Sequence, residues 1–159
     1  MKRFSFKQKL AFQPDILSKE YVLAHGVPYN DEFWQDDYEL EELYDKAPDC
    51  GGKPFTGLLY RLCGDMLISY KFFRDGYPDG EAVRFYETGA LKSYWFGKLR
   101  SPRSVLYQWF PDGKLKYYRE AYYHRTVNAI RYDEAGNIVL FIEKGVSKEV
   151  KANKPKQNP

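Results

Sequence analysis

A chain of 159 residues that is 43% hydrophobic and 30% charged is long enough to bury the core of one globular domain. No apolar run approaches the roughly 20 residues that a membrane-spanning helix needs, and the basic N-terminus is not followed by the apolar stretch of a signal peptide. The net charge is only +3, and we expect a cytoplasmic protein whose Cys50 and Cys63 are reduced thiols rather than a disulfide.

The first thirty residues are predicted to form a pair of strands. Apolar side chains fall at even spacing between Phe4 and Phe12, as they would in a half-buried strand. Pro14 and Asp15 then mark a turn, and a second short apolar run follows at 21–23.

The next segment is the most unevenly charged part of the chain. Between Asp31 and Asp49, nine acidic residues oppose the single base Lys46, so this segment carries −8 and the rest of the chain +11. Such an acidic surface can steer a basic partner and speed its association. It is equally compatible with the solvated face of a helix, and the sequence leaves both interpretations open.

One short helix is predicted within this acidic segment. Asn30 or Asp31 supplies the N-cap, acidic residues in the first turn suit the helix dipole, and Pro48 ends the helix at Ala47. Side chains of this helix form the first group of predicted partner contacts: Trp34, Asp36, Asp37, Tyr38 and Glu41.

A glycine-centred pattern then returns four times. Each copy runs from an aromatic residue through a short polar turn and a glycine to an aliphatic residue and a second aromatic-rich stretch. The turn glycines are Gly64, Gly89, Gly113 and Gly136, separated by 25, 24 and 23 residues. A near-constant period of this size indicates a repeat architecture. Strands are predicted near 56–62, 66–74, 81–86, 91–97, 104–110, 115–123, 126–132 and 138–143.

These strands, joined in order by tight turns, predict a mainly β fold: an open antiparallel meander of hairpin repeats with one short N-terminal helix. Alternation within 91–96 and 115–123 leaves neither face of the sheet purely polar. Tyrosine and tryptophan have an apolar body and a polar tip, so they can pave a half-wet surface. Aromatic side chains of the sheet are the second group of predicted partner contacts: Tyr94, Trp109, Tyr118 and Tyr122.

Three regions are predicted along the chain. Residues 1–52 hold the N-terminal strands and the acidic helix, packed on the repeats, and Cys50 to Gly52 form a hinge. Residues 53–146 form the repeat sheet. Residues 147–159 are basic and nearly free of large apolar side chains, so we expect a flexible tail.

The unit spanning 75–97 resembles the variant MORN-type repeat, and in particular the repeat of the bacterial YwqK-type antitoxin family. The unit around Trp109 matches nearly as well, so the resemblance covers about 53–145. Three units depart from the pattern in places: Asp65 and Met66 crowd the turn of the first, Ser104 stands in the Trp109 unit where a glycine is expected, and Asn137 follows the last turn glycine. The matching residues of the best unit are Gly76, Gly80, Phe85, Tyr86, Gly89, Leu91, Lys92 and Ser93.

This resemblance implies a non-enzymatic antitoxin or immunity protein that binds a cognate toxin and blocks it by occlusion. The acidic helix would then present its carboxylates to a basic toxin, as a nucleic-acid mimic does. MORN-type repeats are also implied to act as membrane-lipid or protein scaffolds, so a structural scaffold is one alternative. The two edges of an open meander also allow a homo-oligomer.

Neither a catalytic site nor a metal site is predicted. The two histidines, His25 and His124, lie far apart in the sequence and show no metal-ligand spacing. No nucleophile motif or phosphate-binding glycine loop accompanies them. The Asp-Gly pairs lack the alternating acids of a calcium loop, and hairpin turns explain them. We therefore expect no enzyme activity and no cofactor.

Single-stranded nucleic-acid binding is the second alternative. Basic and aromatic residues interleave in the second half of the chain, as they do in proteins that stack unpaired bases. Because the bases form no dense cluster, we expect weak electrostatic affinity and favour a protein partner. The interleaved residues are Arg100, Arg103, Tyr107, Trp109, Lys114, Lys116, Tyr117, Tyr118, Arg119, Arg125, Arg131 and Tyr132.

Overall fold

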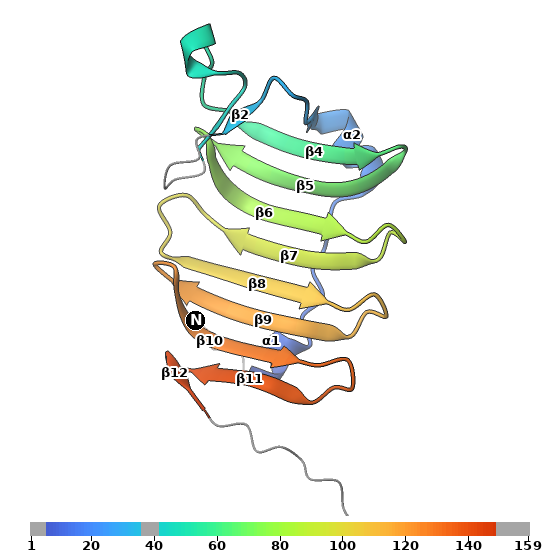
Figure 1. Ribbon diagram of the computed structural model, residues 1–159, viewed down its shortest axis with the longest axis vertical. Helices are drawn as coiled ribbons and strands as arrows, with labels where there is room; N and C mark the ends of the chain where they lie inside the picture. Colours follow the sequence, from blue (N-terminus) through green and yellow to red (C-terminus); the bar gives the residue numbers. More distant parts are fainter. Residues whose placement is uncertain (1–5, 36–41, 149–159) are drawn as a thin grey trace, which may run out of the picture.

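The computed structural model describes residues 6–35 and 42–148. Within them the chain forms a ten-stranded sheet in the order β1-β4-β5-β6-β7-β8-β9-β10-β11-β12 (Figure 1). Neighbouring strands from β4 onward pair antiparallel, so the predicted open meander is confirmed. The strands are β1 (Val27–Pro28), β4 (Gly57–Cys63), β5 (Met66–Arg74), β6 (Tyr77–Phe85), β7 (Leu91–Gly97), β8 (Arg103–Trp109), β9 (Leu115–Tyr122), β10 (Arg125–Tyr132), β11 (Ile138–Glu143) and β12 (Val146–Ser147).

The repeat is visible in the hairpin turns as a repeated backbone geometry. Gly89, Gly113 and Gly136 have φ angles of 83°, 84° and 85°, in the left-handed region that favours glycine. Each of these glycines donates its backbone N–H to the carbonyl three residues earlier, over 2.9 to 3.0 Å. A register shift follows the same position in all four repeat hairpins, after Arg61, Arg84, Gln108 and Arg131. The period in the sequence is therefore a period in the structure.

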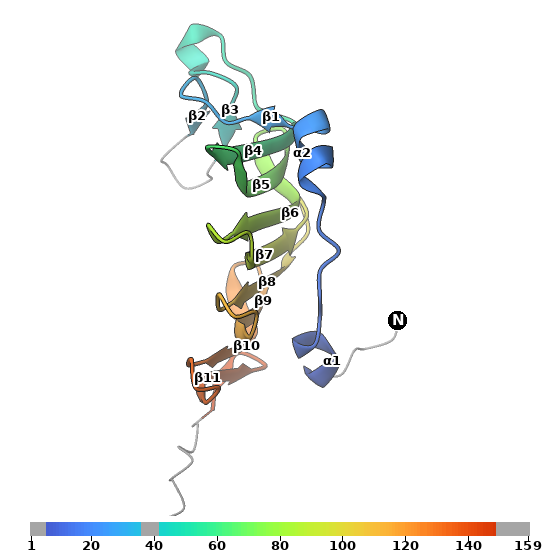
Figure 2. The same ribbon diagram turned by 90° about the vertical axis from the view of Figure 1, so that its right-hand side faces the viewer.

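The N-terminal segment differs from the predicted strand pair. Phe6–Leu10 form helix α1 and Lys19–His25 form helix α2, whose N-cap Ser18 accepts a hydrogen bond from the backbone N–H of Tyr21. Figure 2 shows the segment between these helices running down one face of the sheet, from β4 at one end toward β10 at the other. We call residues 6–25 the strap and the face beneath it the covered face. The strand prediction is wrong here because contact with the sheet, rather than local alternation, decides the conformation.

The main core lies between the strap and the covered face. One cross-strand row contributes an aromatic or aliphatic side chain from each of eight neighbouring strands, and we call it the core row. Val22 of the strap is fully buried within the same cluster, and Phe12 packs against Tyr94 and Tyr107, with ring centroids 5.8 and 4.9 Å away. The core row is Tyr60, Tyr70, Val83, Tyr94, Tyr107, Tyr118, Ile130 and Phe141.

Tyrosine hydroxyls of the core row hold the strap by hydrogen bonds. The backbone N–H of Leu17 donates to the hydroxyl of Tyr70 over 3.0 Å, and that hydroxyl donates to the carboxylate of Glu81 over 2.9 Å. The hydroxyl of Tyr107 donates to the backbone carbonyl of Lys9 over 3.1 Å. Tyrosine is needed at these positions because its ring fills the core while its hydroxyl satisfies polar groups of the strap.

An ion pair fixes the other end of the strap. The ammonium group of Lys9 bonds to the carboxylate of Glu120, which also accepts hydrogen bonds from Asn128 and Tyr118. Burial acts to raise the pKa of Glu120, but these hydrogen bonds outweigh it and hold the pKa below its ordinary value. Glu120 is thus ionised at neutral pH and its charge is paired.

The acidic segment is also built differently from the prediction. In its described part, β2 (Trp34–Gln35) and β3 (Leu43–Tyr44) pair antiparallel as a small second sheet, and a short 3-10 helix, Pro48–Cys50, follows. A continuous helix from Asp31 to Ala47 is therefore wrong, because β3 bonds to the repeat sheet instead: the N–H of Leu43 donates to the carbonyl of Gly76 over 2.8 Å.

This β2–β3 unit lies on the opposite side of the sheet from the strap (Figure 2). It covers only the β4–β5 end, where Leu43, Phe55, Leu59 and Phe73 form a second, smaller core. The predicted region boundaries stay predictions, and most of the predicted flexible tail lies outside the described residues.

Candidate binding face

The face of the sheet opposite the strap is open from β6 to β11. Side chains alternate between the two faces along each strand, and the paired register lines them up across the strands. We call this surface the open face. Its large and charged side chains, including two from the β4–β5 end, are Arg61, Lys71, Arg84, Trp95, Leu106, Gln108, Tyr117, Arg119, Arg131, Leu140 and Ile142.

The open face carries bases and, within the described strands, no acid. By the same alternation Glu81, Glu120 and Glu143 fall on the covered face. Asp79 lies in the irregular part of β6, where it pairs with Arg74 over 2.8 Å and accepts the backbone N–H of Leu99. The strands of the open face therefore carry guanidinium groups without carboxylates, whereas the covered face carries both, since Arg103 and Arg125 also lie there.

The guanidinium groups of the open face recur at one equivalent position of the repeat. Arg61, Arg84, Gln108 and Arg131 occupy the equivalent position of the four repeats, immediately before the register shift of each hairpin. They lie in one cross-strand row, which we call the arginine row, at every second strand. Because strands lie about 4.8 Å apart, successive members are about 10 Å apart. Ser69, Ser93 and Tyr117 occupy the strands between them.

Some bases of the open face already contact other groups of the chain, and others do not form an ion pair with any described acid. The guanidinium group of Arg61 lies 3.9 Å from the ring centroid of Tyr29, and the ammonium group of Lys71 lies 5.0 Å from that of Phe73. Arg119 donates to the carbonyl of His124 over 3.5 Å. Arg84 and Arg131 are exposed, and no acid among the described residues forms an ion pair with either.

Trp95 lies at the centre of the open face, between Ala82 of β6 and Leu106 of β8. Its indole lies over the backbone of Gly97 in its own strand, because a Cβ atom added to Gly97 would lie only 2.6 Å from two ring atoms of Trp95. Gly97 is not among the glycines with positive φ, so the absence of a side chain, and not backbone freedom, is what this position requires. The small residues at 82 and 97 leave the indole lying against the sheet.

Replacing Gly97 with alanine is expected to lift the indole of Trp95 from the sheet and to destabilise the protein by about 1–3 kcal/mol, the usual cost of overpacking. A 15N-labelled sample should show a shifted Trp95 indole N–H resonance. In a Trp95→Phe background the smaller ring relieves the clash, so the same change should cost much less in a double-mutant cycle. Equal costs in both backgrounds would show that the contact is not what requires glycine.

The structure buries three of the predicted contact residues. Tyr94, Trp109 and Tyr118 are 9%, 4% and 1% exposed and belong to the core beneath the strap. Their predicted exposure is wrong, because the strap covers the sheet face on which they lie. Tyr122 is 47% exposed and Trp34 37% exposed, so both are accessible to a partner.

The remaining predicted contacts, Asp36, Asp37, Tyr38 and Glu41, lie outside the described residues. Their role as contacts for a basic partner stays a prediction. Among the residues considered for nucleic-acid binding, Tyr117, Arg119 and Arg131 share the open face, whereas Tyr107, Trp109 and Tyr118 are buried on the covered face.

Sequence reasoning missed Arg84 and Trp95. The signal for Arg84 was available, because a base or glutamine precedes a large apolar residue just before every repeat turn: Arg61-Leu62, Arg84-Phe85, Gln108-Trp109 and Arg131-Tyr132. The signal for Trp95 was Gly97, two residues after it: this glycine lies within a strand rather than in a turn, which indicates that a bulky neighbour needs the space of its side chain.

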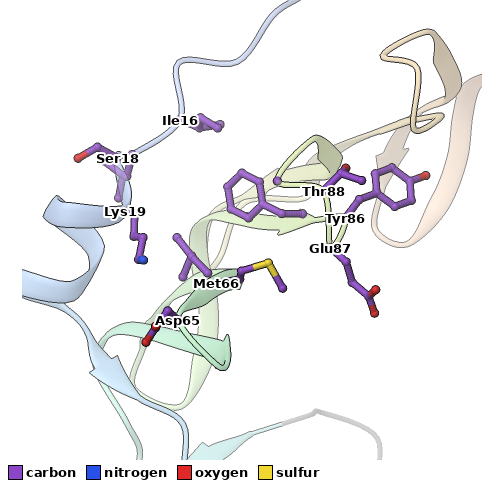
Figure 3. Close-up of a pocket in the computed structure, with 12 residues that line it drawn as sticks. Ile16, Ser18, Lys19, Asp65, Met66, Tyr86, Glu87 and Thr88 are labelled. Atoms are coloured by element: carbon purple, nitrogen blue, oxygen red, sulfur yellow. The ribbon is translucent and has the colours of Figure 1, made fainter.

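A separate apolar groove of about 550 Å³ lies on the covered side, at the tips of the first two repeat hairpins. Figure 3 shows Ile16 and Lys19 of the strap on one side of it, facing Met66 and Thr88 of the hairpin tips. This groove is the gap left where the strap passes over the ends of the strands. Residues 6–35 and 42–148 contain no cluster of ligand-type side chains that could hold a metal ion.

No helix in the described ranges is long and apolar enough to cross a membrane. The resemblance to the MORN-type repeat rests on the sequence of residues 75–97 and of the unit around Trp109. Comparison with protein-family models, with curated proteins and with solved structures found no match for this chain.

Proposed function

We propose that this chain is a non-enzymatic binding protein that uses the open face of its sheet to contact a protein partner and neutralises that partner by occlusion. The role is the one that the resemblance to antitoxin and immunity proteins implies. One observation carries the choice of surface: the open face gathers tryptophan, tyrosine and arginine, the side chains that dominate the energetics of protein interfaces.

The architecture supports a surface function in two ways. The strap occupies the covered face and fills it with its own apolar side chains, so that face is used internally. The open face is built on paired strands whose backbone hydrogen bonds are made within the sheet, so its side chains are presented on a rigid platform. A rigid platform lowers the entropic cost of binding.

The experiment combines capture with growth rescue. The tagged chain is used to capture proteins from native lysate, and each captured protein is expressed alone and with this chain. Under the proposal one captured protein arrests growth and co-expression restores it. A Trp95→Ala/Tyr117→Ala variant should lose both capture and rescue, whereas the control Tyr123→Ala, which alters an exposed ring just after β9, should keep both.

Thermal unfolding of both variants verifies that they are folded. If the control variant and the open-face variant lose capture alike, the open face is not the contact surface. If no captured protein arrests growth, the neutralising role is wrong.

A second candidate function is binding of single-stranded nucleic acid. The observation that favours it is that Tyr117, Arg119 and Arg131 lie on one face, where a base could stack on the ring and phosphates could pair with the guanidinium groups. Salt-sensitive retention of the protein on single-stranded DNA, with no captured protein, would support this function instead.

A further inference from the structure

We propose that the open face binds an acidic, extended segment of the partner, whose carboxylates pair with Arg84 and Arg131 and whose apolar side chains lie on Trp95 and Tyr117. This inference rests on the proposed function and adds the chemistry of the partner. Three of the four equivalent repeat positions on the open face carry an arginine and so a charge of +1 each.

Arg84 and Arg131 are the open-face side chains with which an anionic partner would pair. Both side chains are exposed, both stand in the arginine row, and neither has an acid in ion-pair distance among the described residues. The planar guanidinium group bonds a carboxylate through two parallel N–H donors, which gives direction as well as charge complementarity. A face whose strands carry several bases and no acid repels basic segments and selects acidic ones.

The register sets the length of the segment. Arg84 on β6 and Arg131 on β10 are linked through Ser93, Gln108 and Tyr117, so they are four strand spacings, or about 19 Å, apart. An extended chain advances about 3.3 Å per residue, so two acids some six residues apart can reach both arginines. Such a segment crosses the strands rather than adding to a sheet edge.

The middle of this path is suited to apolar side chains. Trp95 and Leu106 are neighbours in the row beside the arginine row, and Tyr117 stands within the arginine row itself. All three are half-buried, so a partner covers partly desolvated surface there. Ser93 and Gln108 offer polar groups to the partner's backbone. The bound segment is therefore expected to carry an acid at each end, opposite Arg84 and Arg131, and apolar side chains between them.

The same features favour a protein over a nucleic acid. Arg61, Lys71 and Arg119 already have internal contacts, which leaves Arg84 and Arg131 as the bases best placed to bind an anion. Two phosphate contacts give only a weak affinity for nucleic acid. Two carboxylates flanking an apolar centre match the open face in both charge and polarity.

The test uses a fluorescein-labelled peptide, Glu-Glu-Leu-Tyr-Leu-Ser-Glu-Glu, and a counterpart with lysine in place of each glutamate. Fluorescence anisotropy with the full chain should show binding of the acidic peptide that weakens as salt is raised, and at least tenfold weaker binding of the basic peptide. Arg84→Glu/Arg131→Glu should bind the acidic peptide at least tenfold more weakly.

The control Arg103→Glu/Arg125→Glu makes the same charge change. Its two arginines are exposed and flank Tyr122 on the covered side of the sheet. It should bind the acidic peptide within about twofold of the unaltered chain. If the open-face reversal disturbs folding, Arg84→Gln/Arg131→Gln removes the charges without reversing them and should also weaken binding.

Several outcomes would overturn this inference. In the first, both charge-reversed variants lose affinity for the acidic peptide equally. In the second, the open-face variants bind that peptide as tightly as the unaltered chain. In the third, a twelve-nucleotide oligothymidine binds more tightly than the peptide, and its binding depends on Arg84 and Arg131. Light scattering that shows salt-sensitive self-association, abolished only in the open-face variants, would assign the face to a second copy.

The failure of this inference can be told from the failure of the proposed function. A captured toxin that Arg84→Glu/Arg131→Glu still neutralises would sink the acidic-partner inference and leave the neutralising role intact. Binding of the acidic peptide without any growth-arresting partner would support the inference and reject that role.

Discussion

Replacing Tyr118 with alanine is expected to destabilise the protein by about 3–5 kcal/mol, the cost of removing a large aromatic side chain from a well-packed core. Tyr118 is 1% exposed, its ring centroid lies 4.9 Å from that of Tyr107, and its hydroxyl bonds to the carboxylate of Glu120. The substitution leaves a cavity under the strap and removes a hydrogen bond from a part-buried charge. A loss of this size is a large fraction of the stability of a typical domain.

The matched control lies four residues away in the same strand. Tyr122 is 47% exposed, so Tyr122→Ala should change the free energy of unfolding by less than about 1 kcal/mol. Urea unfolding followed by circular dichroism measures both variants, with Tyr118→Phe separating the hydroxyl from the ring. Similar losses for Tyr118→Ala and Tyr122→Ala would mean that the strap does not bury the core row in solution.

The strands and turns of the repeat were predictable because their signals are local. Gly89, Gly113 and Gly136 sit where a tight turn needs positive φ, and the strands between them carry side chains suited to a half-buried sheet. These requirements are met within a few residues of sequence, and the observed β5, Met66–Arg74, has the bounds that the sequence predicted.

The assignment of the two faces could not be made from the same information. In the strand that holds Tyr94 and Trp95 both alternating sets contain large aromatic rings, so periodicity does not say which set is buried. The strap decides it: Phe12 packs on Tyr94, which is buried, while Trp95 is left on the other face. Because the strap joins the sheet through contacts about a hundred residues away in sequence, such as Lys9 with Glu120, no local pattern reveals it.

The same reason accounts for the error in the acidic segment. Its residues Trp34 and Leu43 belong to strands because β2 pairs with β3 and β3 bonds to the turn at Gly76. Spacing of apolar residues in a short charged segment suits a helix equally well, and tertiary pairing selects the strand.

Raising the pH above 10 is expected to unfold the protein cooperatively. Burial, together with the nearby Glu120, raises the pKa of Tyr107 to about 12, and burial raises the pKa of Tyr70 and of Tyr118 as well. In the unfolded chain these hydroxyls ionise near pH 10. Above that pH the unfolded state releases protons that the folded state keeps, so the stability present below pH 10 is lost as pH rises.

Tyr107 alone accounts for roughly 2.3 kcal/mol of this loss by the time the pH reaches its folded pKa, and the two other buried tyrosines add losses of the same sign. Absorbance at 295 nm and far-ultraviolet circular dichroism should be followed together from pH 8 to 12.5. The buried tyrosines should ionise in a late step that coincides with loss of the sheet signal. In 8 M urea all 15 tyrosines should ionise in one step near pH 10. A single such step in buffer, with the sheet signal intact, would show that the strap does not shield the tyrosines of the core row from solvent.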